Sequence, residues 1–177
     1  PSPDSEKGGS FGFATCCGGS KVNSKELAKI SGFSTPNAVL ATFKIPIPLE
    51  VDWSSLVVAL DGINDPGNIG TIIRLCDWFG IENLVCSEDT VDCYNPKVVQ
   101  ASMGSHTRVN ISYFDLKKNL PATSNCMGTF MDGESIYEQN LPKTAVIVLG
   151  NESNGISEEL EDLMRVRLSI PRFGKLQ

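Results

Sequence analysis

The 177-residue sequence predicts an α/β fold, in which a mostly parallel sheet carries helices on both faces. From Leu56 onward, short apolar runs alternate with segments of helical periodicity, the order typical of parallel α/β domains. The runs are apolar throughout rather than alternating, as in strands that are buried on both faces. Hydrophobic and charged contents of 41% and 20% are ordinary for a globular domain. We therefore assign residues 1–48 to a linker region and residues 49–177 to the domain.

The first 48 residues show little regular patterning. Pro1–Ser20 is rich in Gly, Ser and Pro, as in linkers. Lys25–Ile30 predicts one or two helical turns, and Val39–Phe43 predicts an extended segment. Pro46 and Pro48 end any strand there, because proline cannot donate to a ladder.

The first half of the domain predicts two strands around a helix. Leu56–Leu60 is suited to a buried strand, and the helix after it is expected to be capped by Asn68 and ended by Gly80. Asn83–Cys86 predicts the next strand. The expected buried face of the helix consists of Ile69, Ile72, Ile73, Cys76 and Phe79.

The second half continues the alternation. A helix is expected from Pro96 to Met103, with proline at an early position where its missing N–H costs nothing. The last predicted helix follows a Ser157 cap and has acidic residues in its first turn. Its expected buried side chains are Leu160, Leu163 and Met164. The remaining predicted strands are Val109–Ser112, Cys126–Met131, Ala145–Leu149 and Val166–Ile170.

Composition narrows the function classes. A net charge of −6 and a pI of about 4.8 argue against a broad electrostatic grip on nucleic acid, although a local basic site remains compatible with them. Six cysteines without a C-x-x-C pair indicate reduced thiols rather than zinc, and the single histidine, His106, rules out a two-histidine metal site. No apolar run approaches the ~20 residues that span a bilayer. We expect a cytoplasmic protein without a metal or a membrane span.

Three segments combine a strand end with a polar turn. They read N-x-G-x-x-x-R at 68–74, L-G-N-E-x-x-G-I-S at 149–157 and I-P-R-x-G at 170–174. Open α/β folds place ligand sites at such junctions. Taken singly, each has an ordinary alternative: a surface arginine, a helix cap or a plain connecting loop. Neither a phosphate loop nor a G-x-G-x-x-G fingerprint is present.

The order and spacing of the three motifs resemble the SpoU (TrmH-type) RNA ribose 2′-O-methyltransferases of the SPOUT class. The flanks agree, since Asn95–Val99 with Ala101–Gly104 is similar to the linking helix of that family. Thr35–Ala41 resembles the segment that precedes its catalytic domain. The similarity extends from about Lys25 to Gln177.

This resemblance implies a fold with a deep C-terminal trefoil knot and a homodimer that uses S-adenosylmethionine (SAM) to methylate a ribose 2′-hydroxyl of rRNA or tRNA. Residues 1–48 would be the remnant of an N-terminal substrate-binding region, and 49–177 a catalytic domain that stops before the Ser-Leu-Asn segment of the family. Catalysis is expected of Arg74, Asn68 and Glu152, and RNA contact of Arg172 and Lys175. The expected cofactor-binding residues are Leu149, Gly150, Asn151, Gly155, Ile170 and Pro171.

Arg74 is the central catalytic residue that the resemblance implies. Arginine is effectively never deprotonated, so Arg74 is a poor candidate for a free base. A cation that stabilises a developing alkoxide or holds the neighbouring phosphate is physically easier. Glu152 would orient Arg74 or take part in proton removal, and Asn68 would fix the substrate or the motif itself.

Two other functions compete with this reading. A non-catalytic RNA-binding or assembly module could keep the same fold, and saturable binding of SAM distinguishes the two. A flavodoxin-like signalling or nucleotide domain fits the strand-helix alternation, but it leaves the second and third motifs without a purpose.

Overall fold

The computed structural model describes residues 20–32, 34–35, 38–121 and 125–172. The chain forms two compact units, 1–44 and 45–177. In the first unit, α1 (Ser24–Ile30) begins with a capping box, in which Asn23 and Glu26 each accept the other's backbone N–H. The expected extended segment Val39–Phe43 forms no strand.

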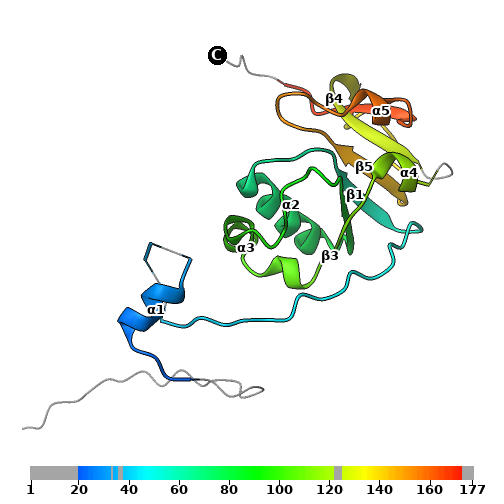
Figure 1. Ribbon diagram of the computed structural model, residues 1–177. Coiled ribbons are helices and arrows are strands. Elements are labelled where there is room, and N and C mark those ends of the chain that lie inside the picture. Colours follow the sequence, from blue (N-terminus) through cyan, green and yellow to red (C-terminus); the bar gives the residue numbers. More distant parts are fainter. Residues whose placement is uncertain (1–19, 33, 36–37, 122–124, 173–177) are drawn as a thin grey trace, which may run out of the picture. The chain divides into compact units, whose positions relative to one another are not determined.

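The second unit contains a six-stranded sheet whose strands are all parallel (Figure 1). The strand order is β3-β2-β1-β5-β4-β6. Parallel neighbours carry their carboxyl ends to one edge, so the loops after β1, β5 and β6 open on the same side of the sheet. The strands are β1 (Leu56–Leu60), β2 (Asn83–Cys86), β3 (Asn110–Tyr113), β4 (Cys126–Ser135), β5 (Ala145–Leu149) and β6 (Val166–Ser169).

Helix α2 (Pro66–Phe79) begins two residues earlier than the predicted cap. Asp65 is its N-cap and accepts the Asn68 backbone N–H at 2.8 Å, with Pro66 at the first helical position. The predicted cap at Asn68 is therefore wrong, and the Asn68 side chain is released for another contact. Phe79, expected in the core, is 71% exposed because the helix has turned it away from the sheet by its last turn.

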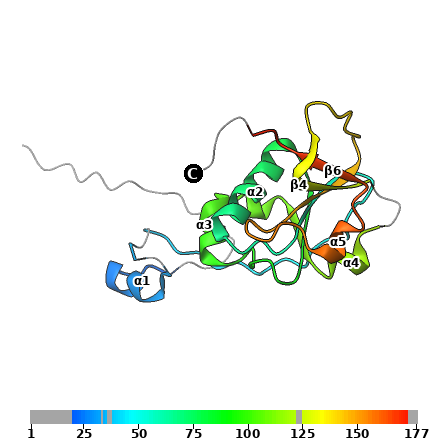
Figure 2. The same cartoon turned by 90° about the horizontal axis from the view of Figure 1, so that it is seen from above.

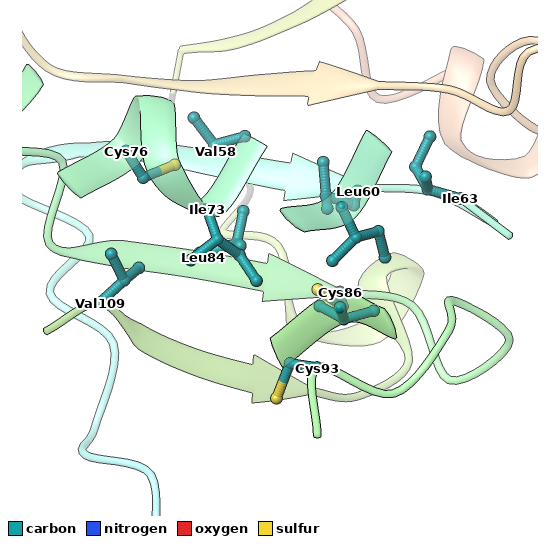
Figure 3. Packing of buried hydrophobic residues seen from close by; sticks show 11 residues of the cluster. Val58, Leu60, Ile63, Ile73, Cys76, Leu84, Cys86, Cys93 and Val109 are labelled. Carbon is teal, nitrogen blue, oxygen red and sulfur yellow. The ribbon is translucent and has the colours of Figure 1, made fainter. Parts of the chain in front are cut away.

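Each face of the sheet carries its own core. On one face, α2 and α3 (Pro96–Ser102) cover Val58 and Leu60 (Figures 1 and 3). On the other face, α4 (Leu116–Asn119) and α5 (Glu158–Glu161) cover Val57 and Ala59. The alternation of β1 side chains between two buried layers explains why its sequence is apolar throughout. Full burial of one such large side chain contributes about 1.5–3 kcal/mol.

Several boundaries differ from the prediction. β4 continues to Ser135, β3 lies one residue later than expected, and β6 ends at Ser169, which leaves Ile170 70% exposed. No sequence pattern predicted α4 or the short 3₁₀ helix η1 (Ser105–Thr107). Elements of three or four residues have too little periodicity to be recognised.

Helix α5, predicted after Ser157, is shorter than its pattern suggested. Leu160 is buried, but Leu163 lies after the helix end and is 36% exposed. Ser157 occupies the N-cap position without a side-chain cap bond. The deep knot depends on the chain after Ser169, of which residues 173–177 lie outside the described part, so the knot stays a prediction.

The cysteines and the histidine hold ordinary structural positions. Cys76, Cys86, Cys93 and Cys126 are buried free thiols, while Cys16 and Cys17 lie outside the described residues. His106 contacts Ser102 Oγ through Nδ1 at 2.9 Å. No group of three metal-ligating side chains occurs among the described residues, and none of their helices is long and apolar enough to cross a membrane.

Candidate active site

The ends of β1 and β5 are joined at the edge of the sheet. Leu60 and Leu149 are register partners, and the Asp61 backbone N–H donates to the Leu149 carbonyl at 2.9 Å. The Asp61 carboxylate accepts the Ser157 backbone N–H at 2.7 Å, across 96 positions. Asp61 is a buried acid to which the sequence motifs assign no role. It joins the loop after β1 to the second motif.

The loop after β5 is a tight structure braced by Asn151. Its backbone exchanges two 2.8 Å hydrogen bonds with Gly155, and its side-chain oxygen accepts the N–H groups of Ser153 and Asn154. Its amide donates to the Gly62 carbonyl at 2.6 Å. The side chain and the backbone N–H of Asn151, a predicted cofactor-binding residue, are thus both occupied by bonds within the protein. The second lone pair of its backbone carbonyl oxygen is left to face a ligand.

Gly150 allows this loop to close. A Cβ at this position would lie 2.2 Å from the Gly155 carbonyl carbon and 2.3 Å from the Ile156 nitrogen. Real Cβ atoms essentially never approach backbone so closely, so no larger residue fits without moving the chain. The glycine is required by the protein's own packing, in addition to any approach by a ligand.

Asn68 and Glu152 connect the first and second motifs directly. Freed from capping, the Asn68 amide Nδ2 donates to Glu152 Oε1 across 84 positions. Glu152 is exposed to solvent, and Asn68 is half-buried. A carboxylate held by an amide donor is available as a base or as a fixed negative charge.

A cleft of about 860 Å³ opens beside this pair. Its walls come from the loop after β5, the middle of β4, the chain after β6 and Glu161 of α5. Leu149, expected at the cofactor site, instead packs against the α2 side of the core. The lining residues are Thr129, Phe130, Met131, Gly150, Asn151, Glu152, Ser153, Asn154, Gly155, Ile156, Glu161, Ser169, Ile170, Pro171 and Arg172.

Arg74 does not line this cleft. It lies six residues after Asn68, which places it about 9 Å along the helix axis and about 120° around it. Arg74 instead lines a second hollow of about 410 Å³ with Leu75, Trp78 and Phe79. Among the described residues it has no ion-pair partner.

Several charged residues outside the large cleft are ion-paired. Arg108 donates to Asp77 at 2.6 Å, and this bond, with a second from Ser105, lowers the pKa of Asp77 to about 2. Lys117 and Lys118 are also ion-paired, so the described part of the chain offers no unpaired cluster there. Arg172 is exposed at the rim of the cleft. Lys175, the other predicted RNA contact, lies outside the described residues.

The family is shown by comparison with known proteins. The profile of the SpoU rRNA Methylase family matches residues 55–177, which includes all three motifs. The chain belongs to this family. The matched residues include the whole of the sheet and the cleft just described.

Individual relatives agree with the family. The chain is 26% identical over 153 residues to the 23S rRNA (guanosine(2553)-2'-O)-methyltransferase RlmP of Bacillus subtilis, covering 81% of this chain and 59% of that protein. It is 32% identical over 128 residues to the 23S rRNA (guanosine-2'-O-)-methyltransferase RlmB of Neisseria meningitidis, covering 69% and 51%. The chain thus spans about half to three-fifths of the length of these relatives.

Solved structures share the fold. A TrmH-family structure from Porphyromonas gingivalis superposes with a TM-score of 0.77 at 39% identity, covering 84% of this chain and 62% of that one. The SpoU methyltransferase AviRb from Streptomyces viridochromogenes, in complex with the cofactor AdoMet, gives 0.62 at 26% identity, covering 72% and 55%. These structures bear out the predicted α/β fold.

Proposed function

We propose that this protein transfers the methyl group of SAM to a ribose 2′-hydroxyl of rRNA or tRNA. The observation that carries the proposal is the contact between Asn68 and Glu152, a residue that lines the cleft, because this contact brings two of the three motifs together. The activity after which the relatives RlmP and RlmB are named supports the reaction type, and the AdoMet in the AviRb structure supports the cofactor.

The residues around the cleft fit SAM. The volume of the cleft lies within the range of about 300–1,000 Å³ that is common for ligand sites. The exposed apolar side chain of Ile170 can cover an adenosine, while main-chain groups of the loop after β5 lie beside it. When bound, SAM supplies an electrophilic methyl group on a sulfonium centre. We assign its binding to Gly150, Asn151, Gly155, Ile170 and Pro171, with Leu149 supporting the loop from the core.

The chain's own residues then need to orient the ribose and handle one proton. Glu152 is placed to accept the hydroxyl proton or to hold a cation, and the Asn68 amide fixes its orientation. Arg74 would stabilise the developing negative charge on the hydroxyl oxygen as a permanent cation. Arg172, at the rim, and Lys175 would contact RNA phosphates.

We further propose that a second copy of the chain brings Arg74 to the cleft. The helix face around Arg74 exposes Leu75 (49%), Trp78 (84%) and Phe79 (71%), an apolar patch that one copy leaves in water. Exposed patches of this kind typically mark association surfaces. A homodimer through α2 would cover the patch and bring Arg74 to the cleft of the partner copy, since Arg74 does not line the cleft of its own chain.

Complementation tests both parts of the proposal. In a mixed dimer, Arg74→Ala and Glu152→Ala chains each lack one function, so neither homodimer should methylate RNA. If Arg74 acts across the interface, the mixed dimer regains one working site. No recovery in a mixed dimer of confirmed composition would contradict the shared site.

Calorimetry separates the enzyme from a non-catalytic RNA-binding module. The full-length protein should bind SAM saturably, and Arg74→Ala should bind it nearly as well while losing methyl transfer. Absence of saturable heat for the unmutated protein would favour the binding module. Full activity of Arg74→Ala would remove Arg74 from the mechanism.

Separate measurements identify the RNA substrate of this protein and its location in the cell. Mapping 2′-O-methyl groups in RNA from cells with and without the gene identifies the substrate. We propose a cytoplasmic location, supported by the buried free thiols of the described cysteines. A mouse relative, 29% identical over 113 residues, is named a mitochondrial rRNA methyltransferase 3, so fractionation should score both compartments.

A further inference from the structure

Arg167 contacts three side chains on two neighbouring elements at the edge of the sheet. From β6, its guanidinium donates through Nη1 to Glu161 of α5 and through Nη2 to Asp132 of β4, both at 3.0 Å. The guanidinium carbon also lies 3.5 Å from the centroid of the Phe130 ring. One planar cation therefore holds a carboxylate on each of two elements and stacks on an aromatic ring.

The partner segment on β4 is irregular at this point. Thr129 and Glu134 both pair with Leu168, so residues 130–133 leave the β4–β6 ladder as a bulge. Figure 2 shows β4 and β6 side by side in this region. Bulges re-aim side chains, and they are common next to functional sites. Here the bulge sends Phe130 and Met131 to the wall of the large cleft.

Two of the groups that Arg167 contacts, Phe130 and Glu161, line the cleft, whereas Arg167 itself does not. The arginine thus lies behind the wall and touches its components. Residues outside a ladder lose the hydrogen bonds that would fix them, so another contact must offset their conformational entropy. The guanidinium is the contact that reaches both Phe130 and Asp132.

A surface ion pair alone would be a weak argument, because exposed pairs contribute little. Arg167 differs from such pairs in geometry. Its three partners lie on two elements, β4 and α5, and the stack on Phe130 requires the plane of the guanidinium, which lysine lacks. A second exposed pair, Lys117 with Glu159 at 3.2 Å, makes a single contact and involves no residue of the large cleft.

We propose that Arg167 is a positioning residue for the cofactor cleft, because it fixes Phe130 and Glu161 in the wall that receives SAM. The inference rests on the proposed function for the identity of the ligand. Arg167 touches neither the cofactor nor the ribose in this role. It sets the shape of the wall that Phe130 and Glu161 form.

This role predicts a specific pattern of kinetic change. Arg167→Ala should raise the KM for SAM and the Kd for S-adenosylhomocysteine about tenfold, the effect of losing about 1.4 kcal/mol of binding free energy. The kcat should stay within about twofold, because Asn68 and Glu152 are untouched. Arg167→Lys should recover part of the affinity through the ion pairs. Lys117→Ala removes the same charge elsewhere and should leave all three constants unchanged.

A measurement without ligand tests the clamp itself. Hydrogen exchange of the backbone amides of residues 130–133 should become about tenfold faster in Arg167→Ala, while the amides of β5 keep their protection. Phe130→Leu, which keeps both ion pairs, should give an intermediate rate. This readout is independent of whether the protein binds SAM.

The outcomes are separable. If the unmutated protein binds no S-adenosylhomocysteine, the proposed function fails, and faster exchange at 130–133 in Arg167→Ala still supports the clamp. If that exchange is unchanged, the clamp is overturned. Unchanged cofactor affinity in Arg167→Ala, or an equal loss in Lys117→Ala, overturns the link between the clamp and the cleft.

Discussion

The side-chain amide of Asn151 donates a 2.6 Å hydrogen bond to the backbone carbonyl of Gly62, joining two loops that lie 89 positions apart. The same side chain accepts two backbone N–H groups of its own loop. A single residue thus joins the second motif to the loop after β1 and shapes the turn beside the cleft. Its contribution is to the architecture of the site.

Replacing Asn151 should lower stability. Asn151→Ala removes three hydrogen bonds and leaves the carbonyl of the buried Gly62 without this donor, which should cost about 1–3 kcal/mol. Urea denaturation measures the loss. Asn154→Ala, in the same loop, should change stability by less than about 0.5 kcal/mol, since this exposed residue takes part in the loop through its backbone. Equal stability of Asn151→Ala and the unmutated protein would contradict the bracing role.

The two glycines of the same loop should respond differently to alanine. Gly150→Ala puts a Cβ 2.2 Å from the Gly155 backbone, so the loop must move, at a cost of about 1–3 kcal/mol and with loss of S-adenosylhomocysteine binding. Gly155 has open space around it but a φ of +73°, so Gly155→Ala should cost about 1–2 kcal/mol. Calorimetry should still detect ligand binding by Gly155→Ala. Binding by Gly150→Ala with unmutated affinity would show that the loop tolerates the Cβ.

Glutamine at position 152 separates charge from hydrogen bonding. Glu152→Gln keeps an acceptor for the Asn68 amide, whereas Glu152→Ala removes it. If Glu152 acts through its charge, both variants should lose kcat by about 10²–10⁴-fold, in the range of general-base catalysis. Methyl transfer from labelled SAM to RNA measures the rates. Near-unmutated activity in Glu152→Gln would restrict Glu152 to holding Asn68.

The Asp77–Arg108 pair should make stability depend on acid pH. Hydrogen bonds from Arg108 and Ser105 lower the pKa of Asp77 to about 2, below the unfolded value of about 3.9. The pair therefore stabilises the fold fully above about pH 4, and this contribution disappears as the pH falls through about 2. The stability difference between the unmutated protein and Asp77→Asn should shrink over this window and at high salt. A difference that is constant from pH 5 to pH 2 would contradict the linkage.

The regular elements could be predicted because their signals are local. An unbroken apolar run such as Leu56–Leu60 needs no distant partner to be read as a buried strand, and its bounds are confirmed. The N-cap of α2 was harder to predict, because Asp65 and Asn68 are both good capping residues and lie three positions apart. Only the backbone bond to the Asp65 carboxylate distinguishes them.

The candidate site could be predicted only as a set of motifs. The sequence identified the loops after β1, β5 and β6, and a parallel sheet brings such loops to one edge. It could not show that the Asn151 side chain is used within the protein, or that Arg74 faces a different hollow from the cleft. Nor did any pattern single out Asp61 or Arg167. Asp61 bonds to Ser157, 96 positions away, and Arg167 bonds to Asp132, 35 positions away.

By itself, the sequence determined the α/β class, most strand positions and the family, because apolar periodicity and ordered motifs are properties of a linear string. The tertiary structure decided which side chains meet. Hydrogen bonds and ion pairs depend on distances of a few ångströms between residues up to 96 positions apart, and such distances exist only after the sheet has assembled.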